Sequence, residues 1–379
     1  MYSILRDELI KTSDVIVVKV GTNVITRSNG HLNEERIGRL VSDIAGMFKK
    51  NKRVILVTSG AVGAGMGSLD LKSRPVEIAE LQAVAAVGQG KLIETYERFM
   101  SQHELCTAQL LLTADDFADR KRYLNVRNTI LALLKFAVLP IINENDTVSV
   151  SRLHTTFGDN DYLATLVANL FDTPLLILLT DVEGLYDRDP VDPDAKLVPI
   201  VEQWTSNLMS MVAEKRSKLS KGGMSSKLKA AKIITESGGN VIIANGDRLD
   251  SLKEIFSAYE VGTLFITQDN HMSARKRWLG FAVRAEGQIV LDDGAVKAVR
   301  ANGRSLLPIG IVAVAGSFDR GAIVSLVDRS GNEIARGLTN YNKGDVTKIQ
   351  GKKTSELHQI LGQPVYAEVV HRDNLQVVD

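Results

Sequence analysis

Two lysines of the sequence lie in surroundings that suit an anion. Lys19 stands near the end of the aliphatic run Val15–Val20 and is followed by Val20-Gly21. Lys227 ends a glycine loop that leads into a helical pattern, Lys221-Gly222-Gly223-Met224-Ser225-Ser226-Lys227. A buried ammonium group is costly unless an anion meets it, and a glycine loop before a helix offers backbone N–H groups to phosphate. The two segments predict a phosphate site, with a solvent-facing side chain as the alternative for Lys19.

Small or polar residues follow two other aliphatic runs, and a third polar segment precedes an expected helix. Residues 57–61 form a strand end and a glycine turn, Val-Thr-Ser-Gly-Ala, which lets backbone N–H groups approach a carboxylate or phosphate. Residues 140–146 pass from an apolar run into Asn-Glu-Asn-Asp, which can hold an ammonium group or a metal. Residues 157–161, Phe-Gly-Asp-Asn-Asp, place two carboxylates and an amide before a helix expected near Tyr162. Capping or turn roles explain each of the last two alone, whereas together they favour an amine or cation site.

A fourth run ends in Thr180-Asp181, so polar segments follow most of the predicted strands. Open α/β sheets bind ligands at the carboxyl ends of their strands. Phosphoryl transfer requires that the spreading negative charge be neutralised and that the donor and acceptor oxygens be held in line. Two lysines, glycine loops and a set of carboxylates meet these requirements.

The elements that position these residues alternate between strand and helix up to about residue 266. Residues 33–49 and 77–100 repeat apolar side chains every three or four positions, as on helices with one buried face. Alternation of this kind predicts an α/β fold with a mainly parallel sheet covered on both sides. The runs that we interpret as buried strands are Val15–Val20, Arg53–Thr58, Val138–Asn143, Leu175–Thr180 and Asn240–Ala244.

The last hundred residues have a different pattern. Short β-rich segments alternate with glycines from Gln288 onward, which predicts a small β domain. Residues 275–379 contain 15 basic and 11 acidic residues, a net charge of +4. We expect two domains, residues 1–270 and 271–379. The clearest β segments of the second are Ile309–Ala315, Ala322–Val327, Glu333–Ala335 and Val365–Val370.

Composition excludes several classes of protein. The 379 residues include 46 basic and 45 acidic residues and 44% hydrophobic residues, as in a globular chain. A single cysteine, Cys106, excludes an intrachain disulfide framework, and the scattered histidines lack zinc-ligand spacing. Without a P-loop, a signal peptide or an apolar run of membrane length, we expect a cytoplasmic protein that does not span a membrane. The glycines of residues 60–67 lack Rossmann spacing, because Ser68 occupies the last glycine position.

Taken together, the segments resemble the amino acid kinase family and, within it, the glutamate 5-kinases. The resemblance also includes Ala-Val-Gly-Gln-Gly at residues 86–90 and the Leu-Thr-Asp that ends at Asp181. Residues 303–311 and 316–321 of the β domain resemble the PUA domain that many glutamate 5-kinases carry. The resemblance implies a three-layer αβα sandwich with a mainly parallel central sheet, followed by a small β-barrel-like PUA domain.

The implied activity is ATP-dependent phosphorylation of the γ-carboxylate of L-glutamate, which gives L-glutamyl 5-phosphate in the first step of proline biosynthesis. The family also implies Mg²⁺, feedback inhibition by proline, a homo-oligomer (dimer or tetramer) and functional coupling to glutamyl phosphate reductase.

The resemblance implies roles for individual residues wherever a motif of this sequence matches one of the family. Lys19 and Lys227 would stabilise the transferred phosphoryl group, and Asp161 would position both ammonium groups. The residues implied for glutamate are Ser59, Asp146, Asn160 and Asn143, with Asp146 facing the α-ammonium group. The residues implied for the nucleotide are Lys19, Thr180, Asp181 and the loop Lys221, Gly222, Gly223, Met224, Ser225, Ser226 and Lys227. No residue is assigned to a metal.

Two segments depart from the family pattern. Ser220-Lys221 replaces the Gly-Thr that opens the nucleotide loop in the family, which puts the shape of the loop in question. Residues 151–156, which include His154, have no match in the family pattern.

Two alternatives stay open at this point. One is a related kinase for aspartate or N-acetylglutamate, which Asp146 would distinguish because only a free amine needs a carboxylate partner. The other is an RNA-binding protein with a vestigial kinase domain, although the β domain has no dense basic stripe with interleaved aromatic residues.

Overall fold

The computed structural model describes residues 2–13, 15–27, 30–148, 159–172, 174–206, 208, 223–248, 250–267, 285–300, 303–362 and 366–378. The chain divides into two compact units: residues 1–116 with 121–271, and residues 117–120 with 272–379. The domain boundary at residue 270/271 stays a proposal, because residues 268–284 lie outside the described part. No helix within the described ranges is long and apolar enough to cross a membrane.

The first unit is built on an eight-stranded sheet in the order β3-β4-β2-β1-β5-β7-β8-β6. Neighbouring strands are parallel except β7 and β8, which confirms the predicted mainly parallel sheet. The strands are β1 (Ile16–Val20), β2 (Val54–Val57), β3 (Thr107–Leu112), β4 (Leu139–Glu144), β5 (Leu175–Thr180), β6 (Ile200–Val201), β7 (Asn240–Asn245) and β8 (Thr263–Phe265). Every residue of β1, β2 and β5 is buried, because helices cover both faces at the centre of the sheet.

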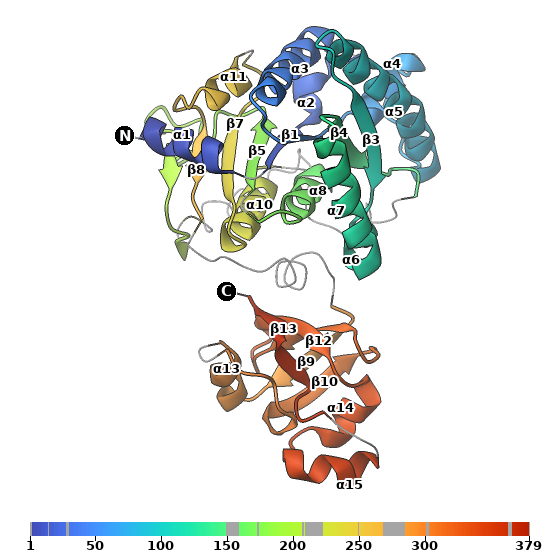
Figure 1. Ribbon diagram of the computed structural model, residues 1–379, viewed down its shortest axis with the longest axis vertical. Coiled ribbons are helices and arrows are strands. Elements are labelled where there is room, and N and C mark those ends of the chain that lie inside the picture. Colours follow the sequence, from blue (N-terminus) through green and yellow to red (C-terminus); the bar gives the residue numbers. More distant parts are fainter. Residues whose placement is uncertain are drawn as a thin grey trace. The chain divides into compact units, whose positions relative to one another are not determined.

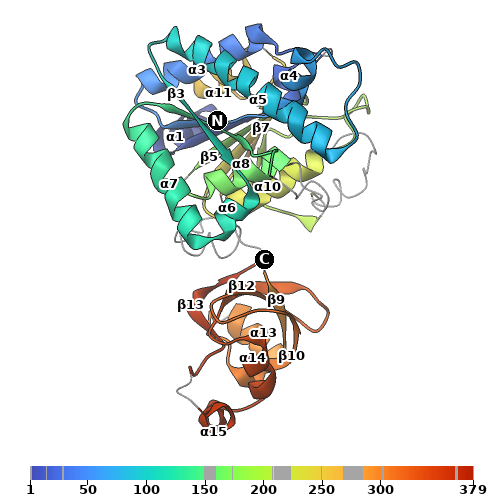
Figure 2. The ribbon, with the colours of Figure 1, turned by 90° about the vertical axis from the view of Figure 1, so that its right-hand side faces the viewer.

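Helices form the outer two layers of this unit (Figures 1 and 2). One face carries α3 (Glu34–Lys49), α4 (Ala61–Ser68), α5 (Ile78–Ser101) and α11 (Ser251–Phe256). The opposite face carries α7 (Arg120–Lys135), α8 (Asp159–Ala168) and α10 (Met224–Glu236). Three further helices are α1 (Tyr2–Thr12), α2 (Thr22–Ile25) and α6 (Ala114–Ala118), the last of which extends beyond residue 116, where the first unit is interrupted. The three-layer αβα prediction is thus confirmed.

Two features of the sequence bring α4 close to the strand ends. Gly60, between β2 and α4, has a positive φ of 93°, a conformation that side-chain-bearing residues rarely adopt. Farther along, α4 crosses α5 in close contact, because a Cβ atom on Gly88 would lie 1.8 Å from the carbonyl oxygen of Ala61. A Cβ atom on Gly65 would likewise lie 1.9 Å from the carbonyl oxygen of Val84. Glycines therefore hold the start of α4 beside α5.

The structure corrects one expected helix start. The sequence favoured a helix from about Tyr162, but α8 begins at Asp159, so Asn160 and Asp161 lie in its first turn. Acidic residues in a first turn are favoured by the helix dipole, which explains why this polar segment is helical.

The second unit has its own hydrophobic core and a five-stranded sheet in the order β10-β9-β11-β12-β13. Its strands are β9 (Gly287–Leu291), β10 (Ile311–Gly316), β11 (Ile323–Val327), β12 (Glu333–Thr339) and β13 (Val370–Val377). Its helices are α13 (Asp293–Arg300), α14 (Lys343–Ile349), α15 (Leu357–Leu361) and the 3₁₀ turns Pro308–Gly310 and Thr354–Glu356. The strand expected at Val365–Val370 was wrong, because β13 begins at Val370 and continues through a polar sequence that lacks a strong β pattern.

Candidate active site

One buried carboxylate lies between two buried lysines at the carboxyl end of the central strands. Asp161 is 1% exposed, and Lys19 and Lys227 are 7% and 6% exposed. The Nζ atom of Lys19 lies 2.7 Å from Oδ1 of Asp161, and that of Lys227 lies 3.5 Å from Oδ2. β1, α8 and α10 each supply one of the three side chains. The sequence predicted this grouping, and the structure brings all three residues together.

The charges of the three groups are coupled. Burial alone would raise the pKa of Asp161, but the two lysines hold it below its ordinary value. Burial lowers the pKa of Lys227, the Asp161 carboxylate opposes this effect, and the ammonium group of Lys19 adds to it. Two ammonium groups share one carboxylate, which leaves a net positive charge suited to an anionic ligand.

The start of α10 faces the same carboxylate. Ser226 donates a hydrogen bond from Oγ to Oδ2 of Asp161 (2.7 Å) and also reaches the carbonyl oxygen of Gly223 (2.8 Å). Gly223 is the N-cap residue of α10, and Met224 and Ser225, both partly exposed, follow in the first turn. A helix N-terminus presents unpaired backbone N–H groups, which suits phosphate. The predicted nucleotide residues Lys221 and Gly222 lie outside the described residues.

A chain of side-chain amides adjoins the carboxylate. Nδ2 of Asn160 donates to the carbonyl oxygen of Thr58 (2.9 Å), Oγ of Ser59 (2.7 Å) and Oδ1 of Asn143 (3.1 Å). Nδ2 of Asn143 donates in turn to Oε1 of Gln89 (2.7 Å). Oδ1 of Asn160 is buried and accepts no hydrogen bond from the described residues. Three of the four predicted glutamate residues therefore meet in one network that ends in an unused acceptor.

The fourth, Asp146, lies just beyond this network. It lines a pocket of about 260 Å³ together with Gln89 and Glu144. The pocket lies between α5 and the ends of β3 and β4, so Gln89 is common to the pocket and the amide network. Its volume exceeds that of a few waters and suits part of a small organic molecule.

The two predicted nucleotide residues at the end of β5 are also held in place. Asp181 accepts hydrogen bonds from Oγ1 of Thr180 (3.0 Å) and Nδ2 of Asn23 (3.2 Å). Burial alone would raise the pKa of Asp181, but these hydrogen bonds lower it below its ordinary value. The N–H of Gly246 donates to the carbonyl oxygen of Thr180 (2.7 Å), which ties the end of β5 to the loop after β7.

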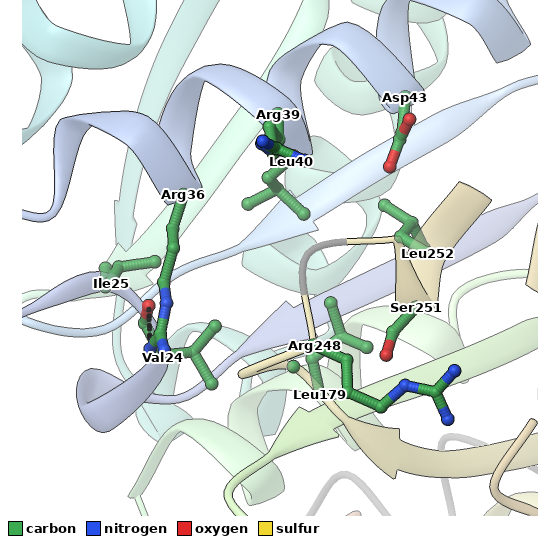
Figure 3. A pocket seen from close by; sticks show the side chains of 11 residues that line it. Val24, Ile25, Arg36, Arg39, Leu40, Asp43, Leu179, Arg248, Ser251 and Leu252 are labelled. Carbon is green, nitrogen blue, oxygen red and sulfur yellow. Dashed lines mark hydrogen bonds between the residues drawn. The ribbon is translucent and has the colours of Figure 1, made fainter. Parts of the chain in front are cut away.

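A second, smaller pocket lies on the face of α3 and α11 (Figure 3). Its volume of about 30 Å³ suits a water molecule and excludes a substrate. The buried hydroxyl of Ser251, which has no partner within the described ranges, borders it. Asp43 also lines it, and burial together with the nearby Asp250 raises the pKa of Asp43 to about 6. We interpret this pocket as structural.

Sequence reasoning missed Gln89 and Asn23 as parts of the site. Gln89 belongs to the motif Ala-Val-Gly-Gln-Gly, and Asn23 follows the Val20-Gly21 turn after Lys19 by two positions, but their contacts join segments 54 and 158 positions apart. Tyr96 was also missed; its hydroxyl pairs with Oγ1 of Thr58 (2.9 Å) below the network. The residue types alone gave no signal for these partners.

The described residues contain no group of three or more His, Cys, Asp or Glu side chains that could hold a metal ion. Mg²⁺ usually keeps waters and binds through one or two carboxylates together with substrate phosphates. Asp181, which interacts electrostatically with Lys227, is a carboxylate suited to that use, because Asp161 is occupied by Lys19, Lys227 and Ser226.

Comparison with known proteins gives two family matches and full-length relatives. Residues 14–245 match the amino acid kinase family, and residues 287–361 match the PUA domain. A glutamate 5-kinase of Caldanaerobacter subterraneus subsp. tengcongensis is 48% identical over 96% of this chain and 98% of its own length. A glutamate 5-kinase of Moorella thermoacetica is 48% identical over 96% of both chains. One of Paraburkholderia phymatum is 44% identical over 98% of this chain and 99% of its own.

Proposed function

Because the chain belongs to the amino acid kinase family and, within it, to the glutamate 5-kinases, we propose that it transfers the γ-phosphoryl group of ATP to the γ-carboxylate of L-glutamate. A carboxylate oxygen attacks the γ-phosphorus, the bond to the β–γ bridging oxygen breaks, and L-glutamyl 5-phosphate and ADP are the products. This reaction is the first step of proline biosynthesis.

The observation that carries the proposal is the pair of buried lysines on one carboxylate. In this proposal Lys19 and Lys227 neutralise the negative charge that spreads over the phosphoryl group during transfer. Asp161 keeps the two ammonium groups charged and at a fixed separation, so little reorganisation is needed when the reaction occurs. Asp161 itself does not accept a proton, since the two lysines hold its pKa low.

The groups around the three charged residues indicate where ATP and the amino acid bind. Thr180, Asp181 and the start of α10 bind ATP, whose phosphates meet the backbone N–H groups of Met224 and Ser225. Asn160 offers a buried acceptor, which suits an ammonium donor and disfavours a second anion. The carboxylate of Asp146 suits the free α-ammonium group of glutamate, which N-acetylglutamate lacks. The site therefore favours glutamate over N-acetylglutamate as the phosphoryl acceptor.

Mg²⁺ enters this scheme with ATP. Bound to the phosphates, Mg²⁺ would neutralise part of the negative charge on the transferred group. Asp181 is the residue that we propose to contact it directly or through water.

Three further properties belong to the proposal because the resemblance to the family implies them: feedback inhibition by proline, assembly into a dimer or tetramer, and coupling to glutamyl phosphate reductase, which uses the product. Titration of the activity with proline tests the first property, and sedimentation of the purified chain tests the second. Product channelling in a mixture of the two enzymes tests the third.

The proposed function is tested by ATP turnover of the purified chain with Mg²⁺ and, in turn, glutamate, aspartate and N-acetylglutamate. Trapping with hydroxylamine distinguishes acyl phosphate formation from ATP hydrolysis. We expect ADP and hydroxamate with glutamate and with neither aspartate nor N-acetylglutamate. Hydroxamate with N-acetylglutamate at a comparable rate would refute the role of Asp146. Hydroxamate with aspartate at a comparable rate would refute glutamate as the preferred acceptor, and the absence of any hydroxamate would refute the kinase.

A further inference from the structure

Two backbone groups set the polarity of the amide network. The carbonyl oxygen of Thr58 can only accept, so the group of Asn160 that faces it is the NH₂. The backbone N–H of Glu144 can only donate (2.9 Å), so the atom of Asn143 that faces it is Oδ1. That oxygen also receives the NH₂ of Asn160, and both ends of the network therefore impose the same orientation on Asn143.

The orientation of Gln89 follows from that of Asn143. Because Oδ1 of Asn143 already accepts two hydrogen bonds, its NH₂ group faces Gln89. Gln89 therefore accepts that hydrogen bond through Oε1. Nε2 of Gln89 is consequently turned away from Asn143, and it makes no hydrogen bond to the described residues. Gln89 is only 9% exposed, yet it lines the 260 Å³ pocket beside Asp146. An amide donor is thus held at the wall of this pocket.

The charges of the pocket indicate what this donor can bind. Two of the residues that line it in the described part of the chain, Glu144 and Asp146, are acidic, and none is lysine or arginine. An amino acid that places its ammonium group at Asp146 must also bring its α-carboxylate into the site. Within these walls that carboxylate requires neutral donors, and Gln89 is the buried one whose orientation is already fixed.

We propose that Gln89 is a specificity-determining residue whose Nε2 group donates a hydrogen bond to the α-carboxylate of the amino acid substrate, while its Oε1 atom fixes Asn143. The inference rests on the proposed function, because it assumes that glutamate occupies the pocket. It assigns to Gln89 the choice between an α-carboxylate and a neutral group at that position.

The test compares glutamate with its α-amide, isoglutamine, which keeps the reactive γ-carboxylate. In Gln89→Met the donor is lost, and kcat/KM for glutamate falls about 10- to 100-fold through KM, with KM for ATP unchanged. In Gln89→Glu an acceptor still faces Asn143, but a carboxylate meets the substrate carboxylate. The ratio of kcat/KM for glutamate to that for isoglutamine then falls below the wild-type ratio, and further than in Gln89→Met. Gln82→Met, on the same helix and away from the pocket, serves as the control and keeps the wild-type ratio.

The outcomes separate the two proposals. A wild-type glutamate to isoglutamine ratio in both Gln89 variants would overturn the inference even if their overall activity were reduced, because a merely structural role lowers both substrates equally. Gln89→Glu preserves the contact with Asn143. If Gln89→Met does not fold, the glutamate to isoglutamine ratio of Gln89→Glu still tests the inference. No hydroxamate from glutamate with the unchanged protein would refute the proposed function and, with it, this inference. Turnover of glutamate with an unaltered ratio would refute the inference alone.

Discussion

Replacement of Asp161 by asparagine removes the charge between the two lysines and keeps the shape of the side chain. At an effective dielectric constant of about 20, unit charges at the observed distances of 2.7 and 3.5 Å attract by about 6 and about 5 kcal/mol. Most of this attraction offsets the loss of hydration, and removal of one member of a buried ion pair typically costs about 3–5 kcal/mol. We expect the variant to lose about 3 kcal/mol of unfolding free energy in urea and to lower kcat about 100-fold or more.

The pH dependence makes this prediction specific. Burial lowers the pKa of Lys227, and Asp161 opposes that effect. Without the carboxylate the pKa of Lys227 falls further, so the alkaline limb of the kcat/KM profile moves to lower pH. Asp194→Asn removes the same charge from an exposed position and leaves both stability and profile unchanged. A fall in kcat with an alkaline limb that does not move would refute the reasoning that Asp161 keeps the lysines charged.

Three further predictions concern other parts of the first unit. Lys227→Ala lowers kcat far more than it raises KM for glutamate in steady-state assays, and an equal loss in both would mean that the lysine captures substrate instead of stabilising the transition state. Asp43 has its pKa raised to about 6 by burial and Asp250, so its ionised form costs stability above that pH. Asp43→Asn therefore raises the unfolding free energy by about 1 kcal/mol at pH 8, and this gain shrinks as the pH falls from 6 to 4. An equal gain at pH 6 and pH 4 would contradict ionisation of Asp43 as its cause. Gly88→Ala, whose new methyl group would lie 1.8 Å from the carbonyl oxygen of Ala61, lowers the thermal midpoint by overpacking. Gly46→Ala, in a helix with open space around it, raises the midpoint slightly, and similar shifts for both variants would contradict the close helix crossing.

The central part of the fold could be predicted because its strands carry a strong signal. β1, β2, β4, β5 and β7 are aliphatic, fully or almost fully buried, and followed by polar turns. Parallel strands align their carboxyl ends, so the grouping of Lys19, Asp161 and Lys227 followed from the order of elements.

The edges of the sheets were harder to predict. β6 is two residues long, β3 is only partly buried, and β13 alternates with polar residues, so none has the apolar run that marks a central strand. The start of α8 was placed too late, because Asp159-Asn160-Asp161 reads equally as a turn and as the first turn of a helix.

The amide network could not be predicted from the sequence. Gln89 and Asn143 are 54 positions apart, and their contact depends on how α5 packs against the end of β4. The same helix packs closely against α4 through the glycine contacts, which are equally distant from the local sequence around Gln89 and Asn143. A glutamine in a helix carries no local mark that distinguishes a buried network member from a surface residue.

The most direct test of the account follows oxygen from substrate to product. Glutamate labelled with ¹⁸O in both γ-carboxylate oxygens is incubated with the protein and Mg²⁺-ATP, and the product is trapped with hydroxylamine. If a carboxylate oxygen attacks the γ-phosphorus, each phosphate released by hydroxylamine carries one ¹⁸O atom, and the hydroxamate retains the other. Phosphate without ¹⁸O would contradict phosphorylation of the γ-carboxylate and leave ATP hydrolysis as the reaction observed.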